Sequence, residues 1–341
     1  MTFQEYLDRY LPALEAEMQA IVATAELSLR ELYGMLRYHL GWEDRAFRPI
    51  HGPQPTGKRI RPVLCLLCCE ACGGDWERAL PAAAAVELVH NFSLIHDDIE
   101  DGDTTRRGRP TLWSIWGMPQ ALNAGDTLFT QAHLALFRLA DRGVPPETVL
   151  SALQILLTAC QRLTEGQFLD LWFEGEEEVS VEDYLWMIAR KTAALLSAAC
   201  ELGALVAGAP ADVRERLRTF GYHAGIAFQI QDDILGLWGD PAVTGKPVGS
   251  DLRRGKKTFP VLYALGRAPD LRHLLSNIAG PPDTLEAAMA LLSRSGAREA
   301  ARARVLEEAD RALQALREAV PGSPAANALA DLVQQLAFRD R

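Results

Sequence analysis

The chain has 341 residues, of which 48% are hydrophobic and 23% are charged, and its formal net charge at pH 7 is −10. This is the composition of a globular protein with room for one large domain or two small ones. The acidic excess argues against a binder of nucleic acid or of anionic membranes, because such proteins carry a basic surface. We expect no signal peptide and no membrane span, and therefore a cytoplasmic location.

Apolar residues recur at three- and four-residue spacing along most of the chain, a pattern that predicts α-helices. The predicted helical segments are 4–40, 82–96, 119–140, 146–172, 181–208 and 211–237, with a loop over 102–111. Ser180 is a candidate N-cap for the helix that follows it. Strand-like alternation of any length is missing from the sequence. We therefore predict an all-α fold, a single domain over residues 1–341 whose helices form a bundle around a central cavity.

Cysteine is concentrated in one predicted helix. Four of the six cysteines trace one face of it among leucine and alanine, namely Cys65, Cys68, Cys69 and Cys72. Free cysteine packs as a small hydrophobic residue, and a rigid helix does not easily wrap four thiolates tetrahedrally around zinc. We therefore favour helix packing over a zinc site, and we expect no disulfides in the cytoplasm.

An acidic cluster ends the predicted helix over 82–96. Asp97 and Asp101 lie four apart, so they share a helix face, and their mutual repulsion favours a divalent cation. Magnesium is usually held by one or two carboxylates together with substrate phosphates, and the arginines at 106 and 107 have the shape that grips phosphate. This pattern predicts half of a magnesium–diphosphate site. A solvated helix end explains this stretch alone about equally well.

Two further features make the magnesium interpretation the better one. A second acidic pair, Asp232 and Asp233, lies far along the chain within another predicted helix. Lys58 and Arg61 lie three apart at a helix start, where an anion is also favoured by the helix dipole, although such residues are more often simply solvated.

Taken in order, these motifs resemble those of the trans-isoprenyl diphosphate synthases, the polyprenyl synthetase family. The matching segments are 57–62, 87–90, 97–101, 106–108, 123–126, 165–167, 191–192, 228–233, 244–246 and 251–257. The resemblance implies an isoprenoid-synthase fold and a head-to-tail condensation of isopentenyl diphosphate with dimethylallyl, geranyl or farnesyl diphosphate. It also implies a homodimer and no nucleic-acid partner.

The resemblance assigns roles to individual residues. The allylic diphosphate would be bridged by Mg²⁺, as three ions in the bound complex, to Asp97, Asp101 and Asp232, supported by Asp98 and Asp233. Positive charge for the departing diphosphate would come from Arg106, Lys191, Lys246 and Lys256. Thr192 and Gln229 would turn uncharged oxygen dipoles toward the allylic cation. Isopentenyl diphosphate would lie in a second basic pocket formed by Lys58, Arg61, His90 and Arg107. We interpret His96 as a structural, hydrogen-bonded residue.

The second acidic motif departs from the family at its fifth position, where Gly236 stands in place of aspartate. Asp232 is intact, so we expect activity. The glycine leaves open how tightly the metal is held on this side, or which water replaces the missing carboxylate.

Product length depends on the residues that precede Asp97. Ser93 is four residues earlier, about 40° away on a helix and one turn beneath, and Phe92 is the one aromatic residue next to it. In the family, a single aromatic five residues before the motif resembles synthases that make the twenty-carbon product. We predict geranylgeranyl diphosphate, with farnesyl diphosphate as the nearest alternative. Facing helices, for instance near Phe129 and His133, are a second possible floor for the pocket.

Two other functions fit the sequence less well. A terpene cyclase is also helical with Asp-rich magnesium motifs, but it does not need the second diphosphate pocket. A non-catalytic subunit of a synthase heteromer should have lost metal carboxylates, whereas five of the six expected motif aspartates remain.

Overall fold

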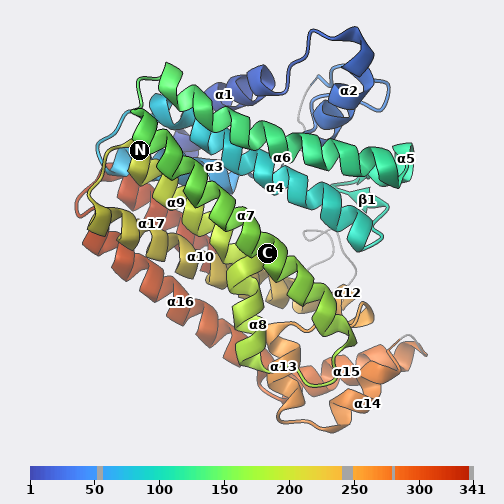
Figure 1. Ribbon diagram of the computed structural model, residues 1–341. Helices are drawn as coiled ribbons and strands as arrows, with labels where there is room; N and C mark the ends of the chain where they lie inside the picture. The colour runs from blue at the N-terminus through green and yellow to red at the C-terminus, as the bar shows by residue number, and fades with distance from the viewer. Residues whose placement is uncertain (52–56, 240–248, 279–280, 338–341) are drawn as a thin grey trace. The chain divides into compact units, whose positions relative to one another are not determined.

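The computed structural model describes residues 1–51, 57–239, 249–278 and 281–337. Most of them are helical, which confirms the predicted all-α class (Figure 1). The chain divides into two compact units. Unit 1 comprises Met1–Leu157, Ala199–Arg214 and Ser323–Ala325, and unit 2 comprises Thr158–Ala198, Glu215–Gly322 and Ala326–Arg341. No helix in the described ranges is both long and apolar enough to cross a bilayer.

Unit 1 is built around helix α4. Its elements are α1 (Phe3–Ile21), η1 (Leu27–Leu29), α2 (Arg30–His39), α3 (Ile60–Ala71), η2 (Trp76–Ala79), α4 (Leu80–Glu100), β1 (Thr105–Arg106), β2 (Arg109–Pro110), α5 (Leu112–Trp116), α6 (Met118–Asp141) and the start of α7 (Pro146–Gly175). The alanines at 82–85 of α4 are fully buried, and small side chains let neighbouring helices approach closely. Accordingly α4 packs along α6 and also against α1 and α3, and Figure 1 shows α4 and α6 side by side.

Local sequence explains two boundaries in unit 1. Gly73, with φ +78°, ends α3, because a left-handed residue after the last helical turn lets backbone N–H groups cap the free carbonyls. The predicted helix over 4–40 is in fact α1, η1 and α2, separated by an irregular segment over 22–26.

The predicted loop over 102–111 contains a small β-hairpin. Thr105 pairs with Pro110 and Arg106 with Arg109, so the turn consists of Arg107 and Gly108, with φ +52° and +73°. Positive φ at both central positions is characteristic of the type I′ turn, whose twist matches that of the flanking strands. The two-residue strands are too short to show any alternation in sequence.

Unit 2 contains the rest of the chain. Its elements are the end of α7, α8 (Val181–Ile188), η3 (Ala189–Ala193), the start of α9 (Ala194–Val206), most of α10 (Ala211–Trp238), α12 (Ser250–Arg253), α13 (Phe259–Leu265), α14 (Asp270–Ser276), α15 (Pro282–Arg294), α16 (Ala297–Ala319) and most of α17 (Pro324–Ala337). One apolar core joins α8, α10, α13 and α16, and a second joins the C-terminal end of α10 with α12 to α15. Ser180 caps α8 in a reciprocal capping box with Asp183, as predicted.

A π-helical turn interrupts the helix predicted over 181–208. Element η3 is this turn, and it carries Lys191 and Thr192. A Cβ atom added to Gly166 of α7 would lie 2.2 Å from the backbone nitrogen of Lys191, so only glycine allows this close approach. Single π-turns are often found at functional sites, since the wider turn redirects side chains.

The cysteine-rich face of α3 is packed as predicted. Cys65, Cys68 and Cys69 are buried, and Cys72 is partly exposed. Burial raises the pKa of the Cys69 thiol to about 12 and that of Cys72 to about 11. These thiols are therefore protonated at neutral pH, as packing groups are.

Candidate active site

The first acidic motif lies where α4 ends in unit 1. The Asp101 backbone N–H donates to the carbonyl oxygen of Asp97 at 2.8 Å, so the two residues are stacked one helical turn apart. Both side chains are partly exposed, whereas Asp98 is only 2% exposed. The helix thus presents two carboxylates outward, as the spacing predicted, and turns the third inward.

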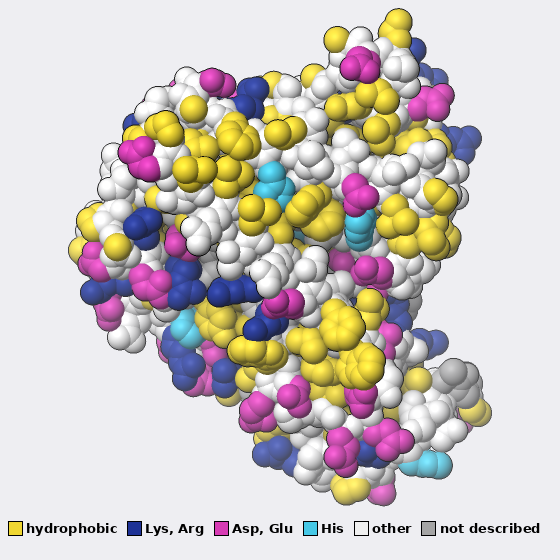
Figure 2. All heavy atoms as spheres, in the orientation of Figure 1, with side chains coloured by type: hydrophobic (Ala, Val, Ile, Leu, Met, Phe, Trp, Pro, Cys, Tyr) yellow, Lys and Arg dark blue, Asp and Glu magenta, His cyan; other side chains and the backbone are white. Residues whose placement is uncertain are grey.

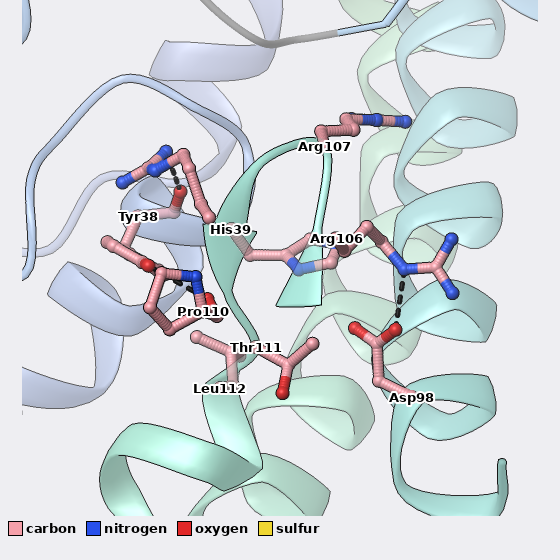
Figure 3. Close-up of a pocket in the computed structure, with 9 residues that line it drawn as sticks. Tyr38, His39, Asp98, Arg106, Arg107, Pro110, Thr111 and Leu112 are labelled. Carbon is pink, nitrogen blue, oxygen red and sulfur yellow. Dashed lines mark hydrogen bonds and ion pairs between the residues drawn. The ribbon is translucent and has the colours of Figure 1, made fainter. Parts of the chain in front are cut away.

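Asp98 holds the first arginine of the hairpin. The Nε of Arg106 donates to Oδ1 of Asp98 at 2.6 Å (Figure 3). Burial raises the pKa of Asp98 to about 6, although Arg106 acts in the opposite direction. Asp98 therefore acts as an anchor that aims a cation.

A further arginine fastens the hairpin to α2. Arg109 donates to the backbone carbonyls of Tyr38 at 2.9 Å and Glu43 at 2.7 Å, and its guanidinium lies 3.9 Å from the centre of the Tyr38 ring. The Tyr38 hydroxyl donates to the carbonyl of Pro110 at 2.8 Å. These contacts border a pocket of about 20 Å³, room for one water molecule (Figure 3). These contacts therefore hold the hairpin, and with it Arg106 and Arg107, in a fixed position.

The second basic pocket predicted from sequence also lies in unit 1. Arg61 Nη1 is 3.3 Å from Nε2 of His90. Burial, followed by the charges of Arg61 and Arg107, lowers the pKa of His90 well below its usual value, so the imidazole is neutral. The Arg107 guanidinium lies against Gly57, where an added Cβ would be 2.9 Å from Nη2. Lys58, the next residue, is exposed. The structure thus places Arg61 next to His90, and Arg107 next to the residue that precedes Lys58.

Sequence reasoning missed the residue that supports this pocket. Arg59 has a left-handed backbone with φ +49°, and its side chain is buried. It donates from Nη1 to Glu87 of α4 at 2.6 Å and from Nε to Glu15 of α1 at 2.9 Å. Glu87 also accepts from Asn91 at 2.9 Å. This buried network fixes the start of α3 between Lys58 and Arg61, and a lone arginine inside a basic motif carries no signal that would distinguish it.

Unit 2 contains the other predicted residues, arranged around a buried carboxylate. Asp233 is 4% exposed and accepts hydrogen bonds from the Tyr184 hydroxyl, from the backbone N–H of Phe259 at 3.2 Å and from Gln229 Nε2 at 3.3 Å. The Thr192 hydroxyl donates to Oε1 of Gln229 at 2.7 Å. Burial raises the pKa of Asp233 to about 7. All the groups that donate to Asp233 are uncharged. The hydrogen bonds to Asp233 and to Thr192 together fix the orientation of the Gln229 side chain.

The other predicted site residues of unit 2 are three lysines and one aspartate. Lys191 forms an ion pair with Asp170 of α7, a partner that the sequence did not reveal. Asp232 is exposed, so the helix turns it outward where Asp233 turns inward. Lys256 is partly exposed, and Lys246 lies outside the described residues.

The donor set fits magnesium bound through a substrate. Across the described ranges, no group of three or more His, Cys, Asp or Glu residues is placed to hold a metal ion by itself. Magnesium does not need such a cage, because it is usually bound by one or two carboxylates and by substrate phosphates. Outward-facing oxygen ligands beside anchored arginine and lysine side chains match that arrangement.

The helix face before the first motif has one bulky ring. Phe92 packs edge-on against Phe129 of α6, with centroids 5.0 Å apart, and Phe129 lies 4.4 Å from His133. Ser93 is buried, and its hydroxyl donates to the carbonyl of His90 at 2.9 Å.

His96 is a packing residue and not the hydrogen-bonded residue that we predicted. Its ring lies against Phe92 and over Gly125, where an added Cβ would be 2.3 Å from Nε2. That nitrogen is 3.6 Å from Oδ1 of Asp126, too long for a hydrogen bond.

Comparison with known proteins identifies the family of this chain. The model of the polyprenyl synthetase family matches residues 48–292. A geranylgeranyl diphosphate synthase of Mycobacterium tuberculosis is 43% identical over 329 residues, which cover 95% of this chain and 92% of that protein. A (2E,6E)-farnesyl diphosphate synthase of Mycobacterium bovis is 40% identical over 344 residues, which cover 97% and 94%. The crystal structure of geranylgeranyl pyrophosphate synthetase from Pyrococcus horikoshii has a TM-score of 0.88 and 35% identity, covering 99% of this chain and 98% of that one.

This family uses Mg²⁺ with diphosphate substrates, which is the chemistry that the outward carboxylates and anchored cations support. The chain belongs to the polyprenyl synthetase family and is a trans-prenyltransferase.

Proposed function

We propose that the enzyme condenses isopentenyl diphosphate head-to-tail with allylic diphosphates and stops at geranylgeranyl diphosphate. The similar proteins named above include both a geranylgeranyl and a farnesyl diphosphate synthase, so their names do not choose between the products. The observation that carries the proposal is the small, inward-bonded Ser93 one turn before Asp97. The bulky neighbour, Phe92, packs on α6.

The residues divide the chemistry between the two units. When bound, three Mg²⁺ ions held by Asp97, Asp101 and Asp232 would neutralise the allylic diphosphate. Arg106, aimed by Asp98, would stabilise the diphosphate as it leaves. The other cations proposed for this role are Lys191, Lys246 and Lys256.

Bond formation then needs an uncharged environment. Oxygen dipoles of Thr192 and Gln229 stabilise the allylic cation without trapping it as a strong nucleophile would. Isopentenyl diphosphate, held by Lys58, Arg61, His90 and Arg107, attacks through its double bond. The new carbon–carbon bond forms, and a proton passes to the released diphosphate. Exclusion of water protects the cation from being quenched.

The product is tested by incubating the enzyme with Mg²⁺, isopentenyl diphosphate and each allylic primer, followed by mass analysis of the dephosphorylated alcohols. We expect a C20 alcohol from all three primers. Ser93→Phe should shorten the product to C15, because a second bulky ring would then stand one helical turn before Asp97. A C15 product from the unaltered enzyme, or an unchanged length in the variant, would contradict the proposal. No elongation at all would revive the regulatory-subunit alternative.

We further propose that the enzyme is a cytoplasmic homodimer formed as one 341-residue domain per chain. Large apolar side chains are exposed on α6 and on the part of α7 in unit 1: Met118, Leu122, Leu134, Phe137, Leu150 and Leu157. Figure 2 shows hydrophobic side chains gathered over these helices. Exposed apolar patches of this kind mark interaction surfaces. Light scattering should give twice the chain mass, and Phe137→Glu should give a monomer.

A further inference from the structure

His39 has a polar atom without a protein partner beside the hairpin. It is the last residue of α2, and its Nε2 is buried and forms no hydrogen bond within the part of the chain that the structure describes. Protein interiors rarely leave such an atom unsatisfied, and a bound water molecule is a common partner for it. The proposed mechanism gives His39 no role, so its position calls for a separate explanation.

The small pocket beside the hairpin offers that explanation. His39 lines this pocket together with Arg106 and Arg107, and Figure 3 shows all three around it. The volume of about 20 Å³ holds one water molecule and is far too small for a diphosphate. Asp98 and Thr111 also line the pocket. A buried water needs about two to four polar partners, and these side chains supply them.

The side chains that face His39 across the pocket have hydrogen-bonding capacity to spare. Oδ1 of Asp98 accepts from Arg106 at 2.6 Å, and a carboxylate has two oxygens that can each accept more than once. The Thr111 hydroxyl donates to the carbonyl of Asp103 at 2.9 Å, and its oxygen can still accept. A water molecule at Nε2 therefore has groups on the far side of the pocket to which it can donate.

The imidazole of His39 is uncharged. Burial, followed by the charges of Arg107 and Arg106, lowers its pKa well below the usual value, and Arg59 and Arg109 act in the same direction. An uncharged ring does not repel these arginines, and it has one donor and one acceptor nitrogen. Water satisfies Nε2 in either tautomer, because water both donates and accepts.

We propose that His39 is a positioning residue that holds one water molecule in this pocket, and that the water joins α2 to the hairpin beside Arg106 and Arg107. The second strand, β2, is already bonded to Tyr38 of α2. The water adds a connection on the side of the two arginines. One hairpin carries both of them, so the same water influences the binding of both diphosphates, a consequence that rests on the proposed function.

Three measurements on the 341-residue chain test the proposal. A crystal structure should show a water molecule within hydrogen-bond distance of Nε2. Hydrogen exchange is followed at the backbone N–H of Thr111, which donates to the carbonyl of Thr104 at 3.0 Å at the base of the hairpin. Steady-state kinetics give KM for the allylic diphosphate and KM for isopentenyl diphosphate separately.

Two substitutions separate the polar atom from the bulk of the side chain. His39→Leu removes Nε2 and keeps a side chain of substantial size. We expect exchange at Thr111 to become about 3- to 10-fold faster and both KM values to rise about 3- to 10-fold, the factor that corresponds to one ordinary hydrogen bond. His39→Gln should restore most of both properties, because its uncharged amide reaches about as far as Nε2. If the leucine variant does not fold, His39→Asn replaces it, since its shorter amide does not reach the pocket.

His273→Leu is the matched control. His273 is exposed on α14 in the other unit, so this substitution should leave the exchange rate and both KM values unchanged. The inference is overturned by a crystal structure without water at Nε2, by a His39→Leu variant with unaltered exchange and KM, or by a His39→Gln variant that behaves as His39→Leu does. If Arg106→Met and Arg107→Met leave both KM values unchanged, the proposed function of the arginines fails instead.

Discussion

The buried carboxylates that lie next to predicted site residues have opposite surroundings in the two units. In unit 1, Asp98 is paired with Arg106 and Glu87 with Arg59, so each buried acid holds a cation. In unit 2, Asp233 is surrounded by a hydroxyl, an amide side chain and a backbone N–H. In the proposed mechanism, the first arrangement would aim positive charge at the diphosphates, whereas the second would align neutral dipoles.

The difference follows from what each part must do. A diphosphate carries concentrated negative charge, so a fixed arginine gains from ionic contact with it. An allylic cation requires oxygen dipoles and would be repelled by another cation beside it. Under the proposed mechanism, one residue type would meet both needs through different partners of the carboxylate, which are ionic for Asp98 and neutral for Asp233.

The largest effect should come from breaking the ionic arrangement of unit 1. Arg59→Met leaves Glu87 buried without its cation, and breaking a buried pair in this way costs about 3–5 kcal/mol of unfolding free energy. Because Arg59 fixes the start of α3, KM for isopentenyl diphosphate should rise more than KM for the allylic substrate. Chemical denaturation and steady-state kinetics measure the two effects.

A matched substitution at an exposed arginine distinguishes the effect of breaking a buried ion pair from the effect of losing any arginine. Arg216 forms an exposed ion pair with Glu318, so Arg216→Met should cost under ~1 kcal/mol. Equal losses in both variants would show that the Arg59 network contributes no more than a surface pair. Arg59→Met/Glu87→Met should recover part of the lost stability, since no charge is then left unpaired.

Exchanging each acid for its amide tests the comparison itself. Asp98→Asn removes the negative charge that aims Arg106, and a hydrogen bond to a charged group is worth about 1.5–3 kcal/mol, so kcat/KM for the allylic diphosphate should fall roughly 10- to 100-fold. Asp233→Asn keeps an oxygen that accepts from Tyr184, and the native acid has a pKa of about 7, so the decrease should be smaller. A larger loss in Asp233→Asn than in Asp98→Asn would reverse our interpretation.

Periodic features of this protein could be predicted from its sequence. One example is the helix over residues 211–237, and another is the shared face of Asp97 and Asp101. Both follow from a repeat of 3.6 residues per turn, a signal to which many positions of the segment contribute. The order of the motifs predicted that the basic residues group together, and the structure brings Arg61 and His90 together.

Features that depend on single long-range contacts could not be predicted. The π-turn at Lys191 accompanies the close approach of Gly166, which is distant in sequence. The ion pair of Lys191 with Asp170 and the contact of Gly236 with Asp251 likewise join residues from different helices. A glycine in a helical pattern signals a close approach but does not identify the partner.

Another buried carboxylate, Glu308 of unit 2, is not one of the proposed site residues and provides a separate test of ionic surroundings. Glu308 accepts from His223 Nδ1 at 2.6 Å and pairs with Arg304 at 2.7 Å, and these partners outweigh burial and lower its pKa. A lowered pKa means that the folded state releases this proton more readily than the unfolded chain. The carboxylate therefore adds stability above its usual pKa and loses it as the pH falls through the folded value. Glu308→Gln should cost about 1.5 kcal/mol at pH 7. The difference from the unaltered protein should begin to shrink below about pH 4.5 in urea denaturation, because the unfolded chain then binds the proton. It should disappear once the folded glutamate is neutral as well. A difference that stayed constant down to pH 3 would mean that the cations do not stabilise Glu308, and that ionic surroundings cannot be inferred from its contacts.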